Sequence, residues 1–598
     1  MTRPPTLRGW VTPRAGLLTA AVAGLLAASA PLTSAQSAAD PNCPAPVPMR
    51  NVSDGMAVHG LTVTSGTARD RFSGEVLGVL RDGIAPGLDM IMVRLEGSQI
   101  TDANGNVDKG IWAGMSGSPV YADNGRLVGA VAYGLSWSPS DVAGVTPAAD
   151  MVKLLKAQPA SPQRQAAADT KRVDIPARVA DQLVASADLT VNQADSGFRR
   201  LPMPFSVSGL SDKHLQKAAD RFNIKRRVVT GGGTTNAAGA EDIVPGGNLA
   251  ASLSYGDITF AGMGTATAVC NEEVLAFGHP MLWSGRSTMS MHGGSAIYIQ
   301  RDNVFGSFKV ANVSIPPVGM INNDRLAGIH GVLGQFPRTT DVTSRVVSLP
   351  NDSSRRGETQ ISQRDYIPYI SALHLLANAD RVFDKLGGGS AKLTWRAEGT
   401  RADGSAWDYT RSNRFANRRD ITFESIYESY QQLGQILRNK LEHVEITNVH
   451  YNAVYDRYHA LEMTQWEVKL GGEWHTILAH RPALNVRAGT DIPVRVTLED
   501  SRSAGSQTVR LMVHVPKSAQ HSEAVLDVSG GDSNYSRDRV KASSFEELLT
   551  NLSNAPRNNE LAATLYTESG PRGETADVDR QVLNDVVTGG KHVHLNVR

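Results

Sequence analysis

The chain has 598 residues, of which 60 are lysine or arginine and 59 are aspartate or glutamate, so its formal net charge is +1 at pH 7. This balance gives no electrostatic basis for binding nucleic acid or an anionic membrane, and we exclude both as expected partners. The length allows about three or four domains of ~150 residues, each large enough for its own core.

The N-terminal segment has the order of a secretory signal. Arginines precede an apolar run from Ala15 to Ala30, and small residues follow it. We therefore expect a signal peptide over residues 1–35, cut after Thr33-Ser34-Ala35. The apolar run is short for a membrane span of ~20 residues, and no later run replaces it. The expectation is an exported protein of the periplasm or extracellular space, with no integral membrane span after signal cleavage.

Two cysteines, Cys43 and Cys270, lie beyond this signal. In an oxidising compartment such a pair favours a disulfide over a metal site, which needs more soft ligands. Two buried free thiols are the alternative. No metal or organic cofactor is expected.

Residues 44–155 contain short alternating segments separated by glycine and aspartate turns, which predicts an antiparallel β unit. Residues 156–244 are interpreted as a linker followed by a mixed α/β connection, because residues 156–172 are rich in Ala, Gln and Pro without apolar periodicity. The glycine cluster at residues 231–233 lacks the Gly-Lys-Ser/Thr ending of a phosphate loop and is interpreted as a plain loop. Strand signals resume over residues 245–350 and predict a second β unit.

Residues 351–535 are predicted to form a β-sandwich-like domain with one long helix. The helix is expected over residues 422–441, where apolar residues recur on one stripe that we assign to the core. Long alternating segments follow it and are typical of a sandwich. Residues 536–598 are expected to form a C-terminal α/β tail. The predicted fold class is therefore mainly β.

The run GIWAGMSGSPVYADNGRLVGAVAYG, residues 110–134, places a serine among small residues and returns at once to an apolar strand. An acyl-transfer nucleophile needs an exposed hydroxyl, nearby backbone N–H groups for the oxyanion and small neighbours. Ser116 meets this description, and the N–H groups of Gly114 and Ser116 occupy the oxyanion positions of the serine-protease template. A hairpin turn at residues 123–125 follows. The alternative interpretation is a tight β-hairpin without chemistry.

Residues 110–119 resemble the signature of the SpoIVB peptidase family, bacterial serine endopeptidases of the cell envelope. Its typical run is Gly-Ile-Val-x-Gly-Met-Ser-Gly-Ser-Pro, and Trp112 stands here in place of the valine. The resemblance implies that Ser116 is the nucleophile of an acyl-enzyme mechanism acting on protein or peptide substrates. It is also similar to the serine turn of chymotrypsin-like proteases, which implies two β units packed as a double barrel with the site between them.

A serine needs a base, and the chain offers fifteen histidines. The family carries its catalytic histidine in a unit that begins Gly-Thr and ends Gly-His, and residues 264–279 match it, which makes His279 the expected base. His59, in the same β unit as Ser116, is the competing candidate. The C-terminal histidines have no common zinc spacing and are interpreted as surface or packing residues.

The third member of the expected triad is Asp102, because the family has an acidic residue in a similar Thr-Asp context shortly before its serine. Asp108 is the runner-up, and an ordinary Asp-Ala-Asn-Gly turn accounts for Asp102 equally well. The resemblance covers about residues 50–150 and 245–345. In the peptidase that names the family the histidine segment precedes the serine segment and a PDZ domain comes first, whereas here the order is reversed and no PDZ pattern is evident.

The sequence thus predicts an exported serine endopeptidase. The similarity to chymotrypsin-like proteases implies that the floor of the specificity pocket lies at Gly110, which has no carboxylate, and so predicts a small or apolar residue at the cleaved position. A non-catalytic envelope binding or scaffold protein with a protease-like fold is the rival hypothesis, supported by the large C-terminal β region. An enzyme that cuts its own segment near residues 156–172 is a third.

Overall fold

The computed structural model describes residues 43–135, 139–157, 172–186, 189–203, 205–224, 228–230, 234–303, 306–478, 482–503, 505–531, 540–567 and 574–598. The predicted signal peptide, nearly all of the predicted linker and the glycine cluster at 231–233 therefore lie outside the described residues. Within them the fold is mainly β, and it contains two closed six-stranded barrels and a β-rich C-terminal region, which confirms the predicted fold class.

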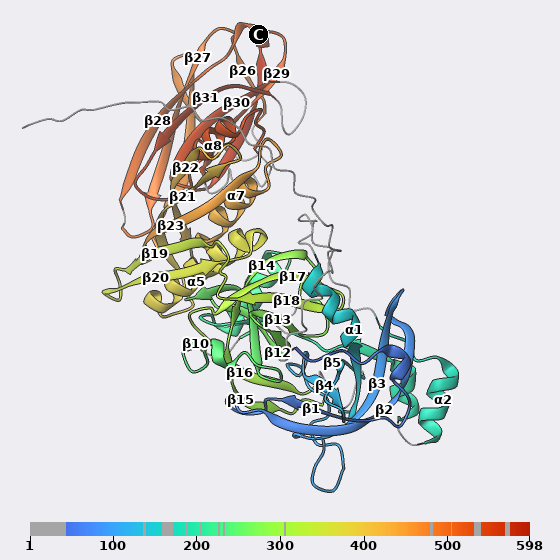
Figure 1. Ribbon diagram of the computed structural model, residues 1–598. Coiled ribbons are helices and arrows are strands. Elements are labelled where there is room, and N and C mark those ends of the chain that lie inside the picture. Colours follow the sequence, from blue (N-terminus) through green and yellow to red (C-terminus); the bar gives the residue numbers. More distant parts are fainter. Residues whose placement is uncertain are drawn as a thin grey trace, which may run out of the picture. The chain divides into compact units, whose positions relative to one another are not determined.

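The first barrel contains the turn at residues 113–118, here called the serine turn, and is drawn in blue and teal in Figure 1. Its strands are antiparallel, and β4 pairs with both β1 and β5, which closes the ring. In order around the barrel they are β4 (Pro119–Ala122), β1 (Ala57–Thr62), β2 (Asp70–Ala85), β3 (Leu88–Gly97), β6 (Val142–Pro147) and β5 (Leu127–Leu135). Nearly every residue of β5 is buried, because one face fills the barrel and the other packs on neighbouring structure.

The second barrel contains the predicted base and is drawn mainly in green. It closes through the pairing of β11 with β12. Its strands in order are β11 (Asn248–Gly256), β14 (Gly285–His292), β17 (Gly319–Arg325), β18 (Gly328–Leu333), β13 (Glu273–Ala276) and β12 (Phe260–Cys270). One apolar cluster contains buried residues of both barrels, among them Leu127 and Ala132 from the first and Ala268 and Leu275 from the second. The two barrels therefore share a core.

Short elements connect and flank the barrels. The helices are α1 (Ala148–Met151), α2 (Ala177–Ala185), α3 (Val191–Ser196) and α4 (Asp212–Arg221). The strands are β7 (Phe198–Arg200), which pairs with β5, β8 (Phe205–Val207) and β9 (Val228–Thr230). A separate small sheet joins β10 (Thr234–Thr235), β16 (Phe308–Ser314) and β15 (Gly294–Gln300).

The sheet of the second barrel continues into the C-terminal half. Its additional strands are β20 (Ser353–Ile361), β19 (Thr340–Ser348), β23 (Val444–Asp456), β21 (Gly389–Arg401) and β22 (Ala406–Asn417). Helix α5 (Ile367–Phe383) contacts β19, β20 and β23 and is almost completely buried.

The helix predicted over residues 422–441 is wrong in its extent. The structure has two helices there, α6 (Ile421–Ser425) and α7 (Tyr427–Leu437), separated at Ile426. Leu441, which the prediction placed in the core stripe, is 41% exposed. The longest helix in the described part of the chain is α5, which the prediction missed because a helix buried on all sides lacks a polar face and therefore the amphipathic period.

The remaining C-terminal strands form two five-stranded sheets that share one apolar core. The first contains β25 (Glu473–Thr476), β24 (Leu461–Leu470), β27 (Asp491–Asp500), β28 (Ser506–His514) and β32 (Val587–Thr588). The second contains β26 (Leu484–Val486), β33 (Gly590–Val597), β29 (Glu523–Gly530), β30 (Glu560–Thr567) and β31 (Glu574–Val582). Helix α8 (Phe545–Ser553) packs on a different apolar core, the one shared by the second barrel, α5 and the strands that extend the barrel sheet, where Phe545 lies beside Trp407. The second sheet thus combines β26 and β29, from the predicted domain at residues 351–535, with β30, β31 and β33, from the predicted tail at residues 536–598.

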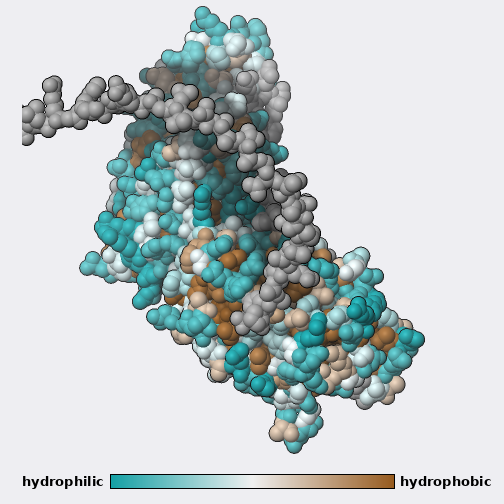
Figure 2. Space-filling view, in the orientation of Figure 1, coloured by the Kyte–Doolittle hydropathy of each residue, from teal (hydrophilic) through white to brown (hydrophobic). Residues whose placement is uncertain are grey.

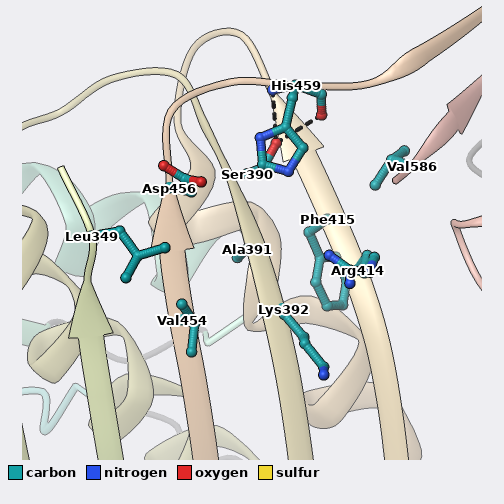
Figure 3. A pocket seen from close by; sticks show the side chains of 10 residues that line it. All are labelled: Leu349, Ser390, Ala391, Lys392, Arg414, Phe415, Val454, Asp456, His459 and Val586. Carbon is teal, nitrogen blue, oxygen red and sulfur yellow. Dashed lines mark hydrogen bonds between the residues drawn. The ribbon is translucent and has the colours of Figure 1, made fainter. Parts of the chain in front are cut away.

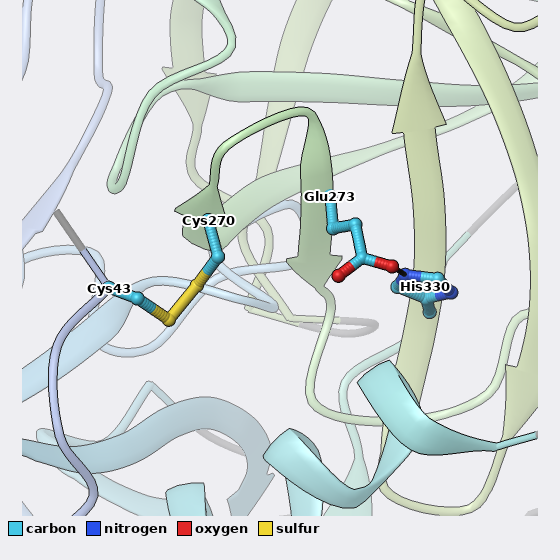
Figure 4. Close-up of a disulfide and its surroundings, with 4 residues drawn as sticks. All are labelled: Cys43, Cys270, Glu273 and His330. Carbon is cyan, nitrogen blue, oxygen red and sulfur yellow. Dashed lines mark ion pairs between the residues drawn. A yellow bond between two sulfur atoms is a disulfide. The ribbon is translucent and has the colours of Figure 1, made fainter. Parts of the chain in front are cut away.

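The predicted disulfide between Cys43 and Cys270 is present (Figure 4). Cys270 is the last residue of β12, and residues just after Cys43 hydrogen-bond to Leu127 of β5. The bridge therefore connects the chain beside the first barrel to the second. Figure 4 also shows Glu273 of β13 beside His330 of the neighbouring β18. Their Oε1 and Nε2 atoms lie 3.5 Å apart.

None of the helices among the described residues is both long enough and apolar enough to cross a membrane. The face seen in Figure 2 is mostly hydrophilic, with apolar residues in scattered patches.

Candidate active site

The serine turn follows Trp112 and leads directly into β4. Gly114 and Gly117 have φ angles of +98° and +97°, which only glycine adopts without strain. Space also requires glycine at 117, since a Cβ there would lie 1.9 Å from the carbonyl oxygen of Thr265. The turn is therefore pressed against β12 of the second barrel.

Three hydrogen bonds from β12 hold this turn. The Thr265 N–H donates to the Ser116 carbonyl at 2.8 Å, and its hydroxyl donates to the Gly114 carbonyl at 3.2 Å. The Thr267 hydroxyl donates to the Gly117 carbonyl at 2.8 Å. The second barrel thus fixes the backbone on which the candidate nucleophile stands.

His279 follows β13 through a tight bend. Phe277 and Gly278 both have positive φ angles, +69° and +67°, and the Thr146 hydroxyl of β6 donates to the Gly278 carbonyl at 2.5 Å. The first barrel therefore holds the backbone just before the candidate base.

The structure brings Ser116 and His279 together. Their Oγ and Nε2 atoms lie 2.8 Å apart, and the imidazole Nδ1 lies 2.9 Å from the Pro280 carbonyl oxygen. Because a carbonyl only accepts, Nδ1 carries the proton and Nε2 accepts from the serine hydroxyl. This is the tautomer that a general base requires.

The pair is buried, with 1% of Ser116 and none of His279 exposed. The expectation of an exposed hydroxyl is therefore wrong for this conformation. Burial, and then the nearby positive charge of Arg200, lowers the pKa of His279 to about 3. The imidazole is thus neutral at ordinary pH.

The two predicted oxyanion donors are free. Neither the Gly114 nor the Ser116 N–H has an acceptor among the described residues, whereas the N–H groups of Met115, Gly117 and Ser118 all donate to backbone carbonyls. Two unpaired donors beside a serine hydroxyl are what an oxyanion hole offers.

The predicted contact between Asp102 and His279 is absent. Asp102 lies in an exposed turn, where its carboxylate accepts from the N–H groups of Asn104 and Asn106, each at 2.9 Å. Hydrogen bonds from Asn106 are the main cause of its lowered pKa. The Thr-Asp run thus makes an ordinary Asx turn, and the Pro280 carbonyl takes the position expected for the carboxylate.

Within the described part of the chain, the two runner-up residues, Asp108 and His59, make contacts with residues other than Ser116 and His279. Asp108 forms an ion pair with its neighbour Lys109 at 2.9 Å. His59 lies on β1 with its ring beside Tyr121, at 5.8 Å between ring centres. Among the hydrogen bonds of the described residues, none joins His59 to Ser116.

Asp324 is a site residue that the sequence did not reveal. It is fully buried on β17 and accepts from the N–H groups of Met281, Leu282 and Ser284, at 2.8, 2.6 and 3.3 Å. Burial raises the pKa of this carboxyl. It holds the loop that follows His279, and a single aspartate near a strand end gave no signal of that role.

Lys309 of β16 covers the serine turn from another side. A Cβ on Gly114 would lie 2.8 Å from the Lys309 Cβ. The Ala113 N–H donates to the Ser307 carbonyl, and the Lys309 N–H donates to the Ala113 carbonyl, each at 2.8 Å. The lysine ammonium donates to the Asn248 side-chain oxygen at 2.8 Å, and burial lowers the pKa of Lys309 to about 7. The lysine thus packs its stem against the turn.

Two surface hollows lie elsewhere. One is lined by ends of β21, β22 and β23 and contains Ser390 and His459, whose backbone atoms the Ser390 hydroxyl contacts (Figure 3). The other lies beside α7 and α8. Neither includes Ser116 or His279. The described residues contain no group of three or more metal-ligating side chains.

No protein-family model, no curated protein and no solved structure matches this chain.

Proposed function

We propose that this protein is an exported serine endopeptidase that cleaves protein substrates in the bacterial cell envelope. The observation that carries the proposal is the 2.8 Å contact between Ser116 Oγ and His279 Nε2 in a double-barrel fold, beside two unpaired backbone N–H groups. The resemblance of residues 110–119 to the SpoIVB peptidase signature supports the same reaction class and the cell-envelope location.

In the proposed reaction Ser116 Oγ attacks the scissile carbonyl carbon while its proton passes to His279 Nε2. The N–H groups of Gly114 and Ser116 bind the oxyanion of the tetrahedral intermediate. His279 then gives the proton to the leaving amine, which departs and leaves an acyl-serine. Water, deprotonated by the same imidazole, hydrolyses that ester and restores the hydroxyl.

The proposed catalytic unit is a serine–histidine pair oriented by a backbone carbonyl. The Pro280 oxygen fixes the imidazole tautomer and orientation, which is one of the two roles of the aspartate in a triad. A neutral carbonyl stabilises an imidazolium less than a carboxylate does. The proposed base is therefore weaker than in a triad, most of all while Arg200 stays beside it.

Labelling with a fluorophosphonate probe tests the proposal, because the probe reacts with a serine that a base has activated. We expect labelling of the wild-type protein, and loss of both labelling and peptide hydrolysis in Ser116→Ala and His279→Ala. Turnover should fall on the order of 10⁴ to 10⁶-fold if the pair acts as a unit.

Ser118→Ala is the matched control. This serine lies two positions further on, is equally buried and donates to the Thr62 hydroxyl at 3.0 Å. It should keep labelling. Label that survives in Ser116→Ala, or that is lost from a folded Ser118→Ala, would contradict the assignment.

A non-catalytic envelope binding protein is the second candidate, favoured by the burial of Ser116 and by the Arg200 charge near the base. It predicts that the folded protein stays unlabelled by the fluorophosphonate probe under all conditions.

A further inference from the structure

Strand β7 lies on the edge of β5 beside the candidate active site. It runs antiparallel to β5, with Arg200 opposite Tyr133 and Phe198 opposite Leu135. The opposite edge of β5 pairs with β6 from Gly129 to Gly134. Strand β4 occupies the β7 edge only as far as Ala130.

The serine turn and Leu201 bind to consecutive residues on that edge of β5. The Gly117 N–H donates to the Val131 carbonyl at 2.8 Å, and the Leu201 N–H donates to the next carbonyl, that of Ala132, at 2.9 Å. Since β7 runs antiparallel to β5, the chain from 198 to 201 advances toward the serine turn. A peptide that is added to this edge as an antiparallel strand would run the same way and bring its C-terminal end to Ser116.

Ala132 also marks the position of the base. A Cβ on Gly278, the residue before His279, would lie 3.0 Å from the Ala132 methyl group. The backbone of Leu201 is therefore anchored where β5 passes both members of the candidate pair.

The Leu201 side chain enters the core of the serine turn. It is 4% exposed and belongs to the apolar cluster that contains Trp112, Met115 and Val131. A Cβ on Gly134 would lie 3.0 Å from its Cδ2 and 3.9 Å from the Ile111 side chain. The Leu201 side chain is thus packed against residues just before Ser116 and against the strand that follows the serine turn.

Arg200 lies over the base. Its guanidinium donates to the Pro280 carbonyl at 3.2 Å, the same oxygen that accepts from His279 Nδ1. Arg199, the neighbour of Arg200 on β7, is exposed, because successive side chains of a strand point to opposite sides.

We propose that residues 198–201 occupy the substrate groove of the candidate protease in the orientation of a bound substrate, with Leu201 in the pocket for the residue before the scissile bond. This inference rests on the proposed function. Substrates are then extended polypeptides with a leucine-like side chain at that position, which must displace β7. The segment is an intramolecular competitor of such substrates.

Pro202 explains why the segment is not itself a good substrate. The bond after Leu201 joins it to a ring nitrogen with no N–H, and the ring crowds the atom to which His279 would return the proton. Proline also restricts the residue before it.

The test compares rates of fluorophosphonate labelling. Leu201→Ala and Arg200→Ala should label about tenfold faster than wild type, because apparent reactivity scales with the open fraction. Arg199→Ala is the matched control on the same strand and should label at the wild-type rate. Circular dichroism confirms that each variant is folded.

Two synthetic peptides separate inhibition from loosened structure. The peptide with the sequence of residues 196–203 should slow the labelling of Leu201→Ala back toward the wild-type rate without being cut. Its counterpart with alanine in place of the proline should be cut after the leucine.

Labelling of Ser116 at equal rates in all these proteins would overturn the inference and leave the proposed function intact. Cleavage of the alanine peptide only at another bond would overturn the register. Folded variants that never label, opened or not, would remove the proposed function and the inference together.

Discussion

His279 Nε2 and Ser116 Oγ lie 2.8 Å apart although 163 positions separate the two residues along the chain. Each belongs to a different barrel, and each barrel holds the backbone of the other's residue, through Thr265 on one side and Thr146 on the other. The contact between the pair is therefore a property of the shared core.

Asp102→Ala should change kcat/KM of the proposed peptidase by less than about twofold, because the hydrogen bonds of its carboxylate to described residues all lie within its own exposed turn. Loss of the aspartate of a true triad costs about 10⁴-fold in kcat. Peptide hydrolysis measured side by side with His279→Ala decides between these. A loss above a hundredfold would restore Asp102 as a partner of the base.

Asp324→Asn should lower the free energy of unfolding by roughly 2 kcal/mol. Both carboxylate oxygens accept hydrogen bonds from backbone N–H groups, and the amide would place its own N–H₂ group against one of these donors. The loop after His279 should loosen, so kcat should fall more than KM rises. Urea unfolding and steady-state kinetics check both effects. Asp341→Asn, at an exposed position on β19, is the control and should match wild type.

Gly117→Ala should disrupt the serine turn, because its Cβ would overlap the Thr265 carbonyl oxygen at a φ of +97°. Gly125→Ala is the control, since Gly125 has a similar φ of +75° but open space around it. Strain at such a φ costs about 1–2 kcal/mol, which Gly125→Ala should show alone. Thermal unfolding should place Gly117→Ala clearly lower. Equal melting temperatures would show that the turn tolerates the overlap.

Acid should destabilise the protein through His279. Its pKa is lowered from 6.5 to about 3 by burial, so between these values the unfolded chain binds a proton that the folded one does not. Stability contributed by the neutral imidazole is complete above about pH 6.5 and is lost as the pH falls, by roughly 1.4 kcal/mol per unit. Buried His292 and His374, each with a pKa lowered to about 4, act in the same direction.

His279→Gln isolates the contribution of this one imidazole. Between pH 6 and 4 its unfolding free energy should depend on pH less steeply than that of wild type, by roughly 1.4 kcal/mol per unit. Denaturant melts at several pH values measure the slopes. Parallel curves would mean that the imidazole is not kept neutral in the folded protein.

The sequence predicted those features that a local pattern carries. Alternating strands with turn residues predicted the mainly β fold, and the small-residue turn suggested Ser116 as the proposed nucleophile. His279 came from the resemblance of its Gly-His segment, and the contact between it and Ser116 depends on two closed barrels that share a core. Two cysteines in an oxidising setting predicted the disulfide.

Other features carry no local pattern. The Pro280 carbonyl that orients His279 is a backbone group, and any residue would supply one. The Thr-Asp run that suggested Asp102 as the partner of the base fits an Asx turn equally well, and the structure has the Asx turn. Helix α5 is apolar on nearly every side, and β7 has only three residues, so neither has a readable period.

The division of the pair between two barrels has a consequence for how the proposed enzyme matures. While only the first barrel has been synthesised, the chain contains the Ser116 hydroxyl without His279, the proposed base that would take its proton. If the protein is an exported peptidase, as proposed, the active pair forms only after the second barrel has folded and docked, and a chain that is still being translocated is inactive.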